Sequence, residues 1–161
     1  GFGDGTDVQA IFDLASPSWE PEETLQYLYD EGVILVEETD LSAKILEPLL
    51  METVSSPSVR ITYDIGNEAS AGHDPAEDLP LLRPWLGSVH IKDRVLGGGT
   101  VPLGTGDADF DTCFQMFAAF RYAGSFILQA ARSDDEMTAV HGYKQFLRPY
   151  FQRYFGTKLW I

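Results

Sequence analysis

Two short stretches, Val59–Asp64 (VRITYD) and Ser88–Asp93 (SVHIKD), indicate what kind of sheet this chain forms. In the first of them Val59, Ile61 and Tyr63 alternate with polar residues, and the second alternates in the same way. Because side chains point to opposite faces along a strand, one face of each strand is apolar and the other is polar. An open doubly wound sheet buries apolar residues on both faces. The alternation therefore favours a barrel, with helices on the apolar side and a polar interior that opens into a site at the carboxyl-terminal strand ends.

The segments on either side repeat a strand-then-helix order. Further strands are predicted over Val33–Glu38 and Phe126–Gln129, and a weaker one over Val8–Leu14. Helices are predicted over Glu20–Glu31, Leu41–Val54, Asp74–Leu82, Phe110–Tyr122 and Asp134–Phe155, the last broken or kinked at Pro149. Such alternation indicates parallel strands. We predict the α/β class and a partial (β/α)8 TIM barrel of about five parallel βα units.

The amino-acid composition limits the kinds of binding partner that are expected. Against 11 Lys and Arg residues the chain has 25 Asp and Glu residues, a net charge of −14. Such a chain repels phosphate backbones and anionic lipid, so neither nucleic acid nor a membrane is expected as a partner. Its apolar runs are far shorter than the ~18 residues of a membrane span. The single cysteine, Cys113, suits a reducing compartment, so we expect a cytoplasmic protein.

Polar side chains stand at four predicted strand ends, namely Glu37 or Glu38, Asp64, His90 and Gln129. Carboxylate, imidazole and amide groups together suit one hard or borderline divalent ion such as Mn²⁺ or Mg²⁺. No cysteine takes part, which excludes a thiolate zinc site. Two plainer interpretations stay open from spacing alone. Acidic residues after strands often cap the next helix, and a single histidine is often a hydrogen-bonded structural residue.

Four motifs follow one another along the chain: Tyr63–Asn67 (YDIGN), Val89–Arg94 (VHIKDR), Pro102–Asp107 (PLGTGD) and Phe126–Gln129 (FILQ). Together they resemble the sugar phosphate isomerase/epimerase branch of the xylose isomerase-like TIM barrels. The resemblance runs from about residue 33 to residue 132. It implies that the strand beginning at residue 33 and the three after it are barrel strands five to eight, and that the weak strand before them is strand four.

The resemblance also implies a metal site. In that family a Glu, an Asp, a His and a second Glu bind one divalent metal, and the two Glu residues move protons at the carbon beside a sugar carbonyl. The stretch Glu38–Leu41 (ETDL) is similar to a family motif and places the first ligand and the catalytic base at Glu38, with Glu37 as the alternative. Asp64 and His90 are the next two ligands.

Where the family has its second Glu, this chain has Gln129. An amide oxygen can bind a hard cation, but it cannot take up a proton at neutral pH. Proton transfer by two bases, Glu38 and Gln129, is therefore in question. Asn67, Lys92 and Arg94 are candidate substrate-binding residues. Equally, the two cations could pair with nearby acids, and the Asn67 amide could satisfy its loop.

The remaining histidines and glycines carry weaker signals. His73 and His141 lie outside the strand ends and are interpreted as surface residues. The glycine run in Gly97–Thr100 is similar to a phosphate-binding loop, but no Lys or strand-to-helix context follows it, and loop flexibility explains it equally well.

These observations predict a metal-dependent isomerase/epimerase of a sugar or sugar phosphate, which removes a proton beside a carbonyl through a metal-stabilised enediolate. A keto-polyol dehydratase would use the same enolate chemistry. A non-catalytic or truncated remnant that binds a metal or polyol is the alternative from another class. The three-metal DNA-repair endonucleases of the superfamily need additional histidines, which are missing at Asn67 and near Pro102–Asp107.

The length of the chain indicates how much of a barrel it can form. A (β/α)8 barrel typically has ~250 residues and at least ~200, whereas this chain has 161. We expect residues 1–161 to form the C-terminal portion of a single barrel domain without strands one to three. Parallel strands in an open set leave two unpaired edges. Self-association or completion by another chain is therefore expected.

Overall fold

The structure, a computed structural model, describes residues 35–38, 41–52 and 58–156. Its elements are, in order, β1 (Leu35–Glu38), α3 (Ala43–Glu52), β2 (Val59–Asp64), α4 (Ile65–Ala71), α5 (Pro75–Leu82), the 3₁₀ helix η1 (Arg83–Trp85), β3 (Leu86–Ile91), β4 (Asp93–Arg94), β5 (Thr100–Val101), α6 (Phe110–Ala119), β6 (Ser125–Leu128) and α7 (Glu136–Phe155). The predicted strand Val8–Leu14 and helix Glu20–Glu31 lie outside the described residues.

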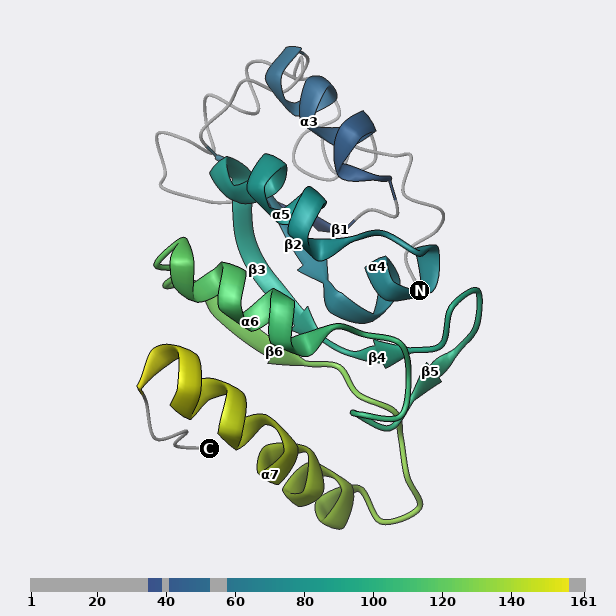
Figure 1. The fold of residues 1–161 in the computed structure, drawn as a ribbon. Coiled ribbons are helices and arrows are strands. Elements are labelled where there is room, and N and C mark those ends of the chain that lie inside the picture. The colour runs from purple at the N-terminus through teal and green to yellow at the C-terminus, as the bar shows by residue number, and fades with distance from the viewer. Residues whose placement is uncertain (1–34, 39–40, 53–57, 157–161) are drawn as a thin grey trace, which may run out of the picture.

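A four-stranded parallel sheet with the order β1-β2-β3-β6 forms the centre of the described part. Helices α5 and α6 lie over the sheet in Figure 1, and α7 lies alongside α6. Consecutive parallel strands with helices between them confirm the predicted α/β class. Because the strands are parallel and adjacent in chain order, their carboxyl-terminal ends meet at one edge.

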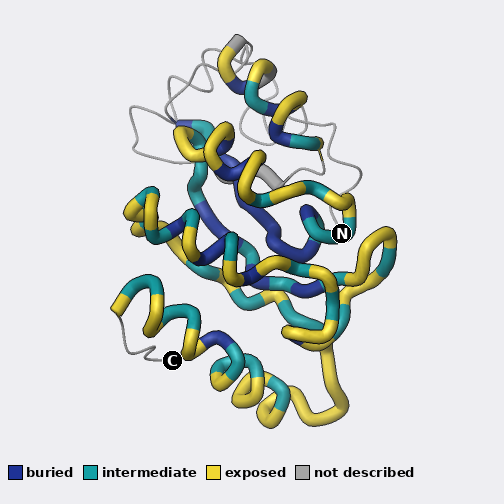
Figure 2. Tube along the Cα trace, in the orientation of Figure 1, coloured by how far each residue is buried: buried dark blue, intermediate teal, exposed yellow. Residues whose placement is uncertain are grey.

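The predicted alternation of the two faces is confirmed. The face under the helices carries the apolar residues, each at most 2% exposed, namely Ile61, Tyr63, Val89 and Ile91. On the opposite face Thr62 and Ser88 are neighbours, with 2.6 Å between their hydroxyl oxygens. Figure 2 shows buried residues gathered along the sheet and the helix faces that cover it. A polar ladder on one side and an apolar layer on the other is the arrangement expected of a barrel wall.

Aromatic packing decides the course of α7. The helix is continuous across Pro149, which excludes the break but not the kink in the prediction of a broken or kinked helix. A proline removes one backbone hydrogen bond. The two residues after it, Tyr150 and Phe151, place their rings 5.3 and 5.0 Å from the Phe114 ring of α6. Phe114 in turn stacks on Phe126 of β6 at 5.6 Å. These contacts hold both helices on the sheet and offset the lost hydrogen bond.

Several element boundaries differ from the predictions, and three differences concern α4, α6 and the end of β3. Helix α4 was not predicted, since Asn67 was placed in a loop, yet this helix follows β2 directly. Helix α6 ends at Ala119 rather than at Tyr122, and Arg121 adopts a positive φ of 56° just beyond it. Strand β3 ends at Ile91 instead of Asp93, because Asp93 turns away into an antiparallel pair with β5. The glycine run lies between the two strands of this hairpin.

Asp93 organises the loop that follows the hairpin. It is 1% exposed, and Oδ2 accepts the backbone N–H groups of Gly104, Thr105 and Gly106 at 2.8, 3.1 and 2.9 Å. Its other oxygen accepts from Ala108 N at 3.2 Å. A Cβ on Gly106 would come within 2.3 Å of Asp93 Oδ1 and 2.6 Å of the Arg94 carbonyl oxygen. The loop therefore wraps around one carboxylate, and only glycine fits at its closest approach.

This arrangement predicts that Asp93→Ala will cost about 3 kcal/mol of unfolding free energy or more, because four part-buried backbone donors lose a charged, buried acceptor. The matched control is Asp107→Ala, since exposed Asp107 accepts a single backbone N–H, from Leu96 at 2.7 Å. It is expected to cost about 1 kcal/mol. Urea denaturation of both variants measures the difference. Equal losses would contradict the role given to Asp93.

Candidate active site

Asp64, the last residue of β2, divides its two carboxylate oxygens between two tasks. Oδ1 accepts the backbone N–H groups of Gly66 and Asn67 at 3.0 and 2.9 Å and so caps helix α4. Oδ2 lies 2.6 Å from Lys92 Nζ and 3.6 Å from His90 Nδ1. The helix-capping interpretation is therefore correct, and it leaves the second oxygen directed at β3. With 2% of its surface exposed, this carboxylate is withdrawn from water.

Strand register explains why Asp64 meets a histidine. Asp64 and His90 are paired across the parallel strands β2 and β3. The separation of 3.6 Å between Oδ2 and Nδ1 is close to the roughly 3–3.5 Å between neighbouring ligands of an ion bound at about 2.1 Å. These two groups therefore fit one divalent cation. At present a cation already faces the carboxylate, because Lys92 Nζ is at ion-pair distance from it.

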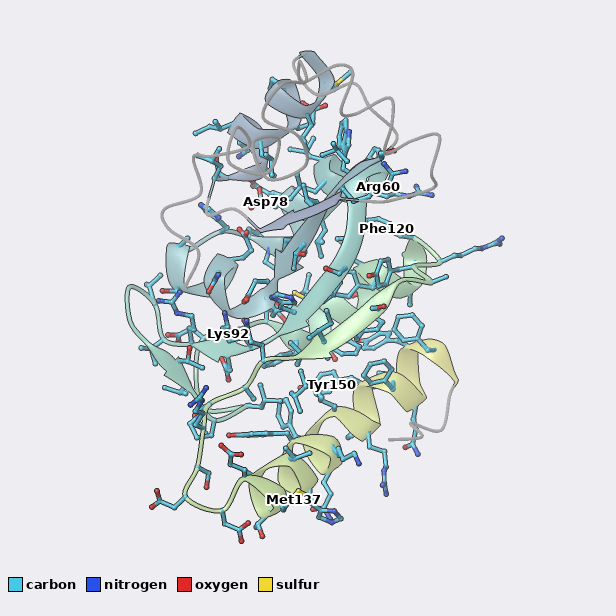
Figure 3. All side chains as sticks on the ribbon, turned by 180° about the vertical axis from the view of Figure 1, so that it is seen from behind. Arg60, Asp78, Lys92, Phe120, Met137 and Tyr150 are labelled. Carbon is cyan, nitrogen blue, oxygen red and sulfur yellow. The ribbon has the colours of Figure 1, made fainter. Side chains whose placement is uncertain are left out.

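The three candidate substrate-binding residues form one cluster beside this pair. Asn67 Oδ1 accepts from Lys92 Nζ at 3.3 Å and from Arg94 Nη1 at 2.9 Å. Arg94 also donates through Nε and Nη2 to the Gly98 carbonyl at 3.0 and 2.7 Å, which ties it to the hairpin. A Cβ on Gly66 would come 2.8 Å from Lys92 Cγ, so a glycine is needed where Lys92 crosses α4. Figure 3 labels Lys92 at this end of the sheet.

The structure gives less information on the other two predicted ligands, at Glu38 (or Glu37) and Gln129. Glu38 ends β1 and is paired with Thr62, whereas Glu37 is paired with Ile61. Their side chains lie outside what the structure describes. Gln129 directly follows β6, its backbone N–H donates to the Ile91 carbonyl at 3.0 Å, and its side chain is exposed. The structure thus brings Asp64 and His90 together and leaves Gln129 at the next strand end.

A second group of ionisable side chains was missed by the sequence analysis. His73 Nδ1 lies 2.5 Å from Glu68 Oε2 and 4.0 Å from Asp78 Oδ2. Ligand atoms of all three lie within 4.8 Å of one another, one group of this kind in the described part of the chain. His73 is only partly at the surface, since its side chain is 20% exposed. His141 is exposed as predicted. The five-residue spacing of the group was the one available signal.

Burial sets the charge state of this second group. It raises the pKa of the Glu68 carboxyl from 4.5 to about 7, against the opposing effect of the His73 hydrogen bond. Burial also raises the pKa of the Asp78 carboxyl. Both shifts have the same physical origin, because the charged form of a carboxyl is disfavoured where water is excluded. Negative charge on the Glu68 and Asp78 carboxyl groups is therefore poorly solvated where they lie.

Most of the chain is similar in sequence to a known protein family. The sequence model for the xylose isomerase-like TIM barrel matches residues 45–150. The chain belongs to this family. A putative L-ribulose-5-phosphate 3-epimerase of Escherichia coli (strain K12) is 31% identical over 85 residues, which are 48% of this chain and 30% of the relative. The sequence-based family resemblance is thereby confirmed.

Two solved structures share the fold of this chain. A xylose isomerase domain protein from Planctomyces limnophilus is 21% identical with a TM-score of 0.73, over 84% of this chain and 53% of that one. A 3-keto-D-glucoside 4-epimerase from E. coli is 20% identical with a TM-score of 0.65, over 85% and 59%. The chain thus spans about half the length of these barrels and under a third of the curated relative. The predicted partial barrel is confirmed.

Among the described helices none combines the length and the apolar character of a membrane span. The cysteine at position 113 is buried and forms no disulfide.

The pKa of Glu68 gives a testable pH dependence. Between pH 4.5 and 7 the folded state holds the Glu68 proton more tightly than the unfolded chain, so the unfolding free energy falls as pH rises through this window. In chelator-treated protein Glu68→Gln should therefore be more stable than the parent at pH 8, by about 1–3 kcal/mol, with the difference shrinking toward pH 4.5. Urea titrations at several pH values measure this. Exposed Glu136→Gln is the control, and a difference that stays constant with pH would contradict the assignment.

Proposed function

We propose that the chain contributes the metal-binding side of a metal-dependent isomerase or epimerase that acts on a sugar or sugar phosphate. The observation that carries this proposal is the pairing of Asp64 Oδ2 with His90 Nδ1 at 3.6 Å, beside the cluster of Asn67, Lys92 and Arg94. Family membership supports it, as does the name of the curated relative. The proposal includes residues 1–161 as part of a single barrel domain in the cytoplasm.

Asp64 and His90 would hold a Mn²⁺ or Mg²⁺ ion, with Glu38 and the amide oxygen of Gln129 as the further ligands. Such an ion, when bound, stabilises the negative charge of an enediolate. Glu38 would accept the proton from the carbon beside the substrate carbonyl. Its pairing with Thr62 supports this choice, because paired residues share a face of the sheet and Thr62 is on the polar face. Glu37 is paired with Ile61, on the helix-covered face.

Lys92 and Arg94 would bind the anionic part of the substrate. Both cations converge on one oxygen, Asn67 Oδ1, so their positive charges stand close together. Their side chains lie at the strand ends of a protein with a net charge of −14. A phosphate or polyol oxygen could replace the Asn67 oxygen as acceptor. A sugar phosphate therefore uses this cluster more fully than a neutral sugar.

Two other functions are alternatives to an isomerase or epimerase. A keto-polyol dehydratase would use the same metal and base, with loss of water from the enolate in place of reprotonation. A non-catalytic metal- or polyol-binding protein is favoured by Gln129, which removes one proton-transferring carboxylate. The edges of the described sheet, β1 and β6, support association with a second copy or completion by another chain as part of the proposal.

The metal assignment is tested by Mn²⁺ binding. His90→Ala and Asp64→Asn should each weaken the tightest Mn²⁺ site at least tenfold, because each removes a ligand or its charge. The asparagine keeps an oxygen that can still cap α4, so the fold should persist. Asp111→Asn is the matched control, since Asp111 pairs with Arg153 on the exposed surface at 2.8 Å. Calorimetry giving parental affinity for both site variants would overturn the assignment.

Restoring a second carboxylate tests the chemistry. Gln129→Glu should tighten Mn²⁺ binding, since one more anionic oxygen offsets the charge of the ion. It should also start or raise proton exchange beside the carbonyl, because a proton acceptor returns to that strand end. The measurement is deuterium incorporation from D₂O into ketoses and ketose phosphates with Mn²⁺ present. Exchange in the parent that disappears in the variant would defeat the lost-carboxylate interpretation. Absence of exchange in both forms would favour the non-catalytic alternative.

A further inference from the structure

The second ionisable group lies on the helix-covered side of the sheet, away from the strand-end cluster. Glu68 belongs to α4, His73 follows the Gly72 that ends this helix, and Asp78 belongs to α5. Figure 3 labels Asp78 on its helix. Because the three residues come from two helices and the short link between them, any ligand they share would join α4 to α5. None of the three is used in the proposed isomerase chemistry.

Asp78 provides an observation independent of the Glu68–His73 contact. Its side chain is 6% exposed, and Oδ2 is a buried oxygen without a hydrogen bond in the described part of the chain. A nearby lysine, Lys44, pairs with Glu77 at 2.7 Å. A buried carboxylate oxygen without a hydrogen bond is costly and rare in folded proteins. Asp78 Oδ2 faces the His73 ring at 4.0 Å, so a cation bound between the two would supply the partner that this oxygen lacks.

The chemistry of the three groups narrows the ligand. Two carboxylates and one imidazole suit a borderline divalent ion, above all Zn²⁺, better than Ca²⁺, which prefers oxygen alone. The ligand atoms lie within 4.8 Å of one another, and a bound ion needs roughly 3–3.5 Å between neighbours. Side-chain rotations that move the ligand atoms by about 1 Å would close that gap. The proton shared by Glu68 and His73 would leave, as ligand groups must be deprotonated.

Space for a fourth ligand is present beside the group. A cavity of about 240 Å³ is lined by Tyr63, Glu68 and His73, among others. The Tyr63 hydroxyl is buried at this cavity, where the weakly hydrogen-bonding Cys113 thiol is its neighbour. Burial raises the pKa of Tyr63, so it stays a neutral donor. A water molecule on the ion could occupy the cavity and accept a hydrogen bond from this hydroxyl.

We propose that Glu68, His73 and Asp78 form a second divalent-metal site, selective for Zn²⁺ or a similar borderline ion, that joins α4 to α5. Its role is structural, since all three protein ligands come from the helix layer. The proposal stands whether or not the strand ends catalyse an isomerisation. The competing arrangement is a metal-free group held by the proton between His73 and Glu68.

The experiment separates the two sites by using a His90→Ala background, in which the strand-end site is weakened. Zn²⁺ is titrated by calorimetry against a competing chelator, and Co²⁺ is followed by its visible absorption. One equivalent of Zn²⁺ should bind in this background. Adding His73→Ala or Asp78→Asn should weaken that binding at least tenfold. His141→Ala is the matched control, because His141 is an exposed histidine in contact with Gln145 and should leave binding unchanged.

Thermal unfolding provides a readout that a metal-independent packing role of Asp78 would not give. In chelator, Asp78→Asn should unfold at the parental Tm or above it, since an uncompensated buried charge is removed. With Zn²⁺ present, the Tm of the parent should rise by several degrees and that of the variant should not. No Zn²⁺ binding in the His90→Ala background would overturn the proposal. So would Zn²⁺ binding that survives both His73→Ala and Asp78→Asn.

Discussion

Asp64 is the point at which the sheet, the first turn of α4 and the strand-end cluster meet. Two backbone N–H groups hold Oδ1 at 3.0 and 2.9 Å, so the side chain cannot rotate freely, and Oδ2 is fixed in the direction of β3. The parallel register then supplies His90 opposite it. Capping also fixes the position of Asn67, on which Lys92 and Arg94 converge. One buried carboxylate therefore links His90, Asn67 and Lys92, while the Gly98 carbonyl holds Arg94 beside them.

The charges around Asp64 suggest how metal and substrate binding could be coupled. Lys92 Nζ lies 2.6 Å from Oδ2 and neutralises a carboxylate that is withdrawn from water. A divalent ion bound to the same oxygen would repel this ammonium group. The released lysine would remain next to Arg94 through their shared acceptor and would become available to an anion. On this view Lys92 is the stand-in cation in the metal-free protein and an anion ligand in the metal-bound one.

The sequence predicted those features that depend on local pattern. Two-residue alternation located β2 with the observed bounds, and the motifs assigned chemistry to residues that the fold brings together, such as Asp64 with His90. Features that depend on contacts distant in sequence were not predicted. Asp93 was taken for a strand end because its four backbone donors lie 11 to 15 residues later. The prediction of a break or kink at Pro149 did not include the aromatic contacts with another helix.

The two ionisable groups are connected through α4. This helix has only seven residues, and helices of that length are marginal without anchors. Asp64 holds its first turn, while Glu68 ties it to His73 beyond its end. Tyr63 and Asp64 are consecutive in β2, so the first faces the helix layer and the second the strand-end cluster. An ion joining Glu68, His73 and Asp78 would therefore stiffen the segment that positions Asn67, so that the helix layer supports the site without contacting a substrate.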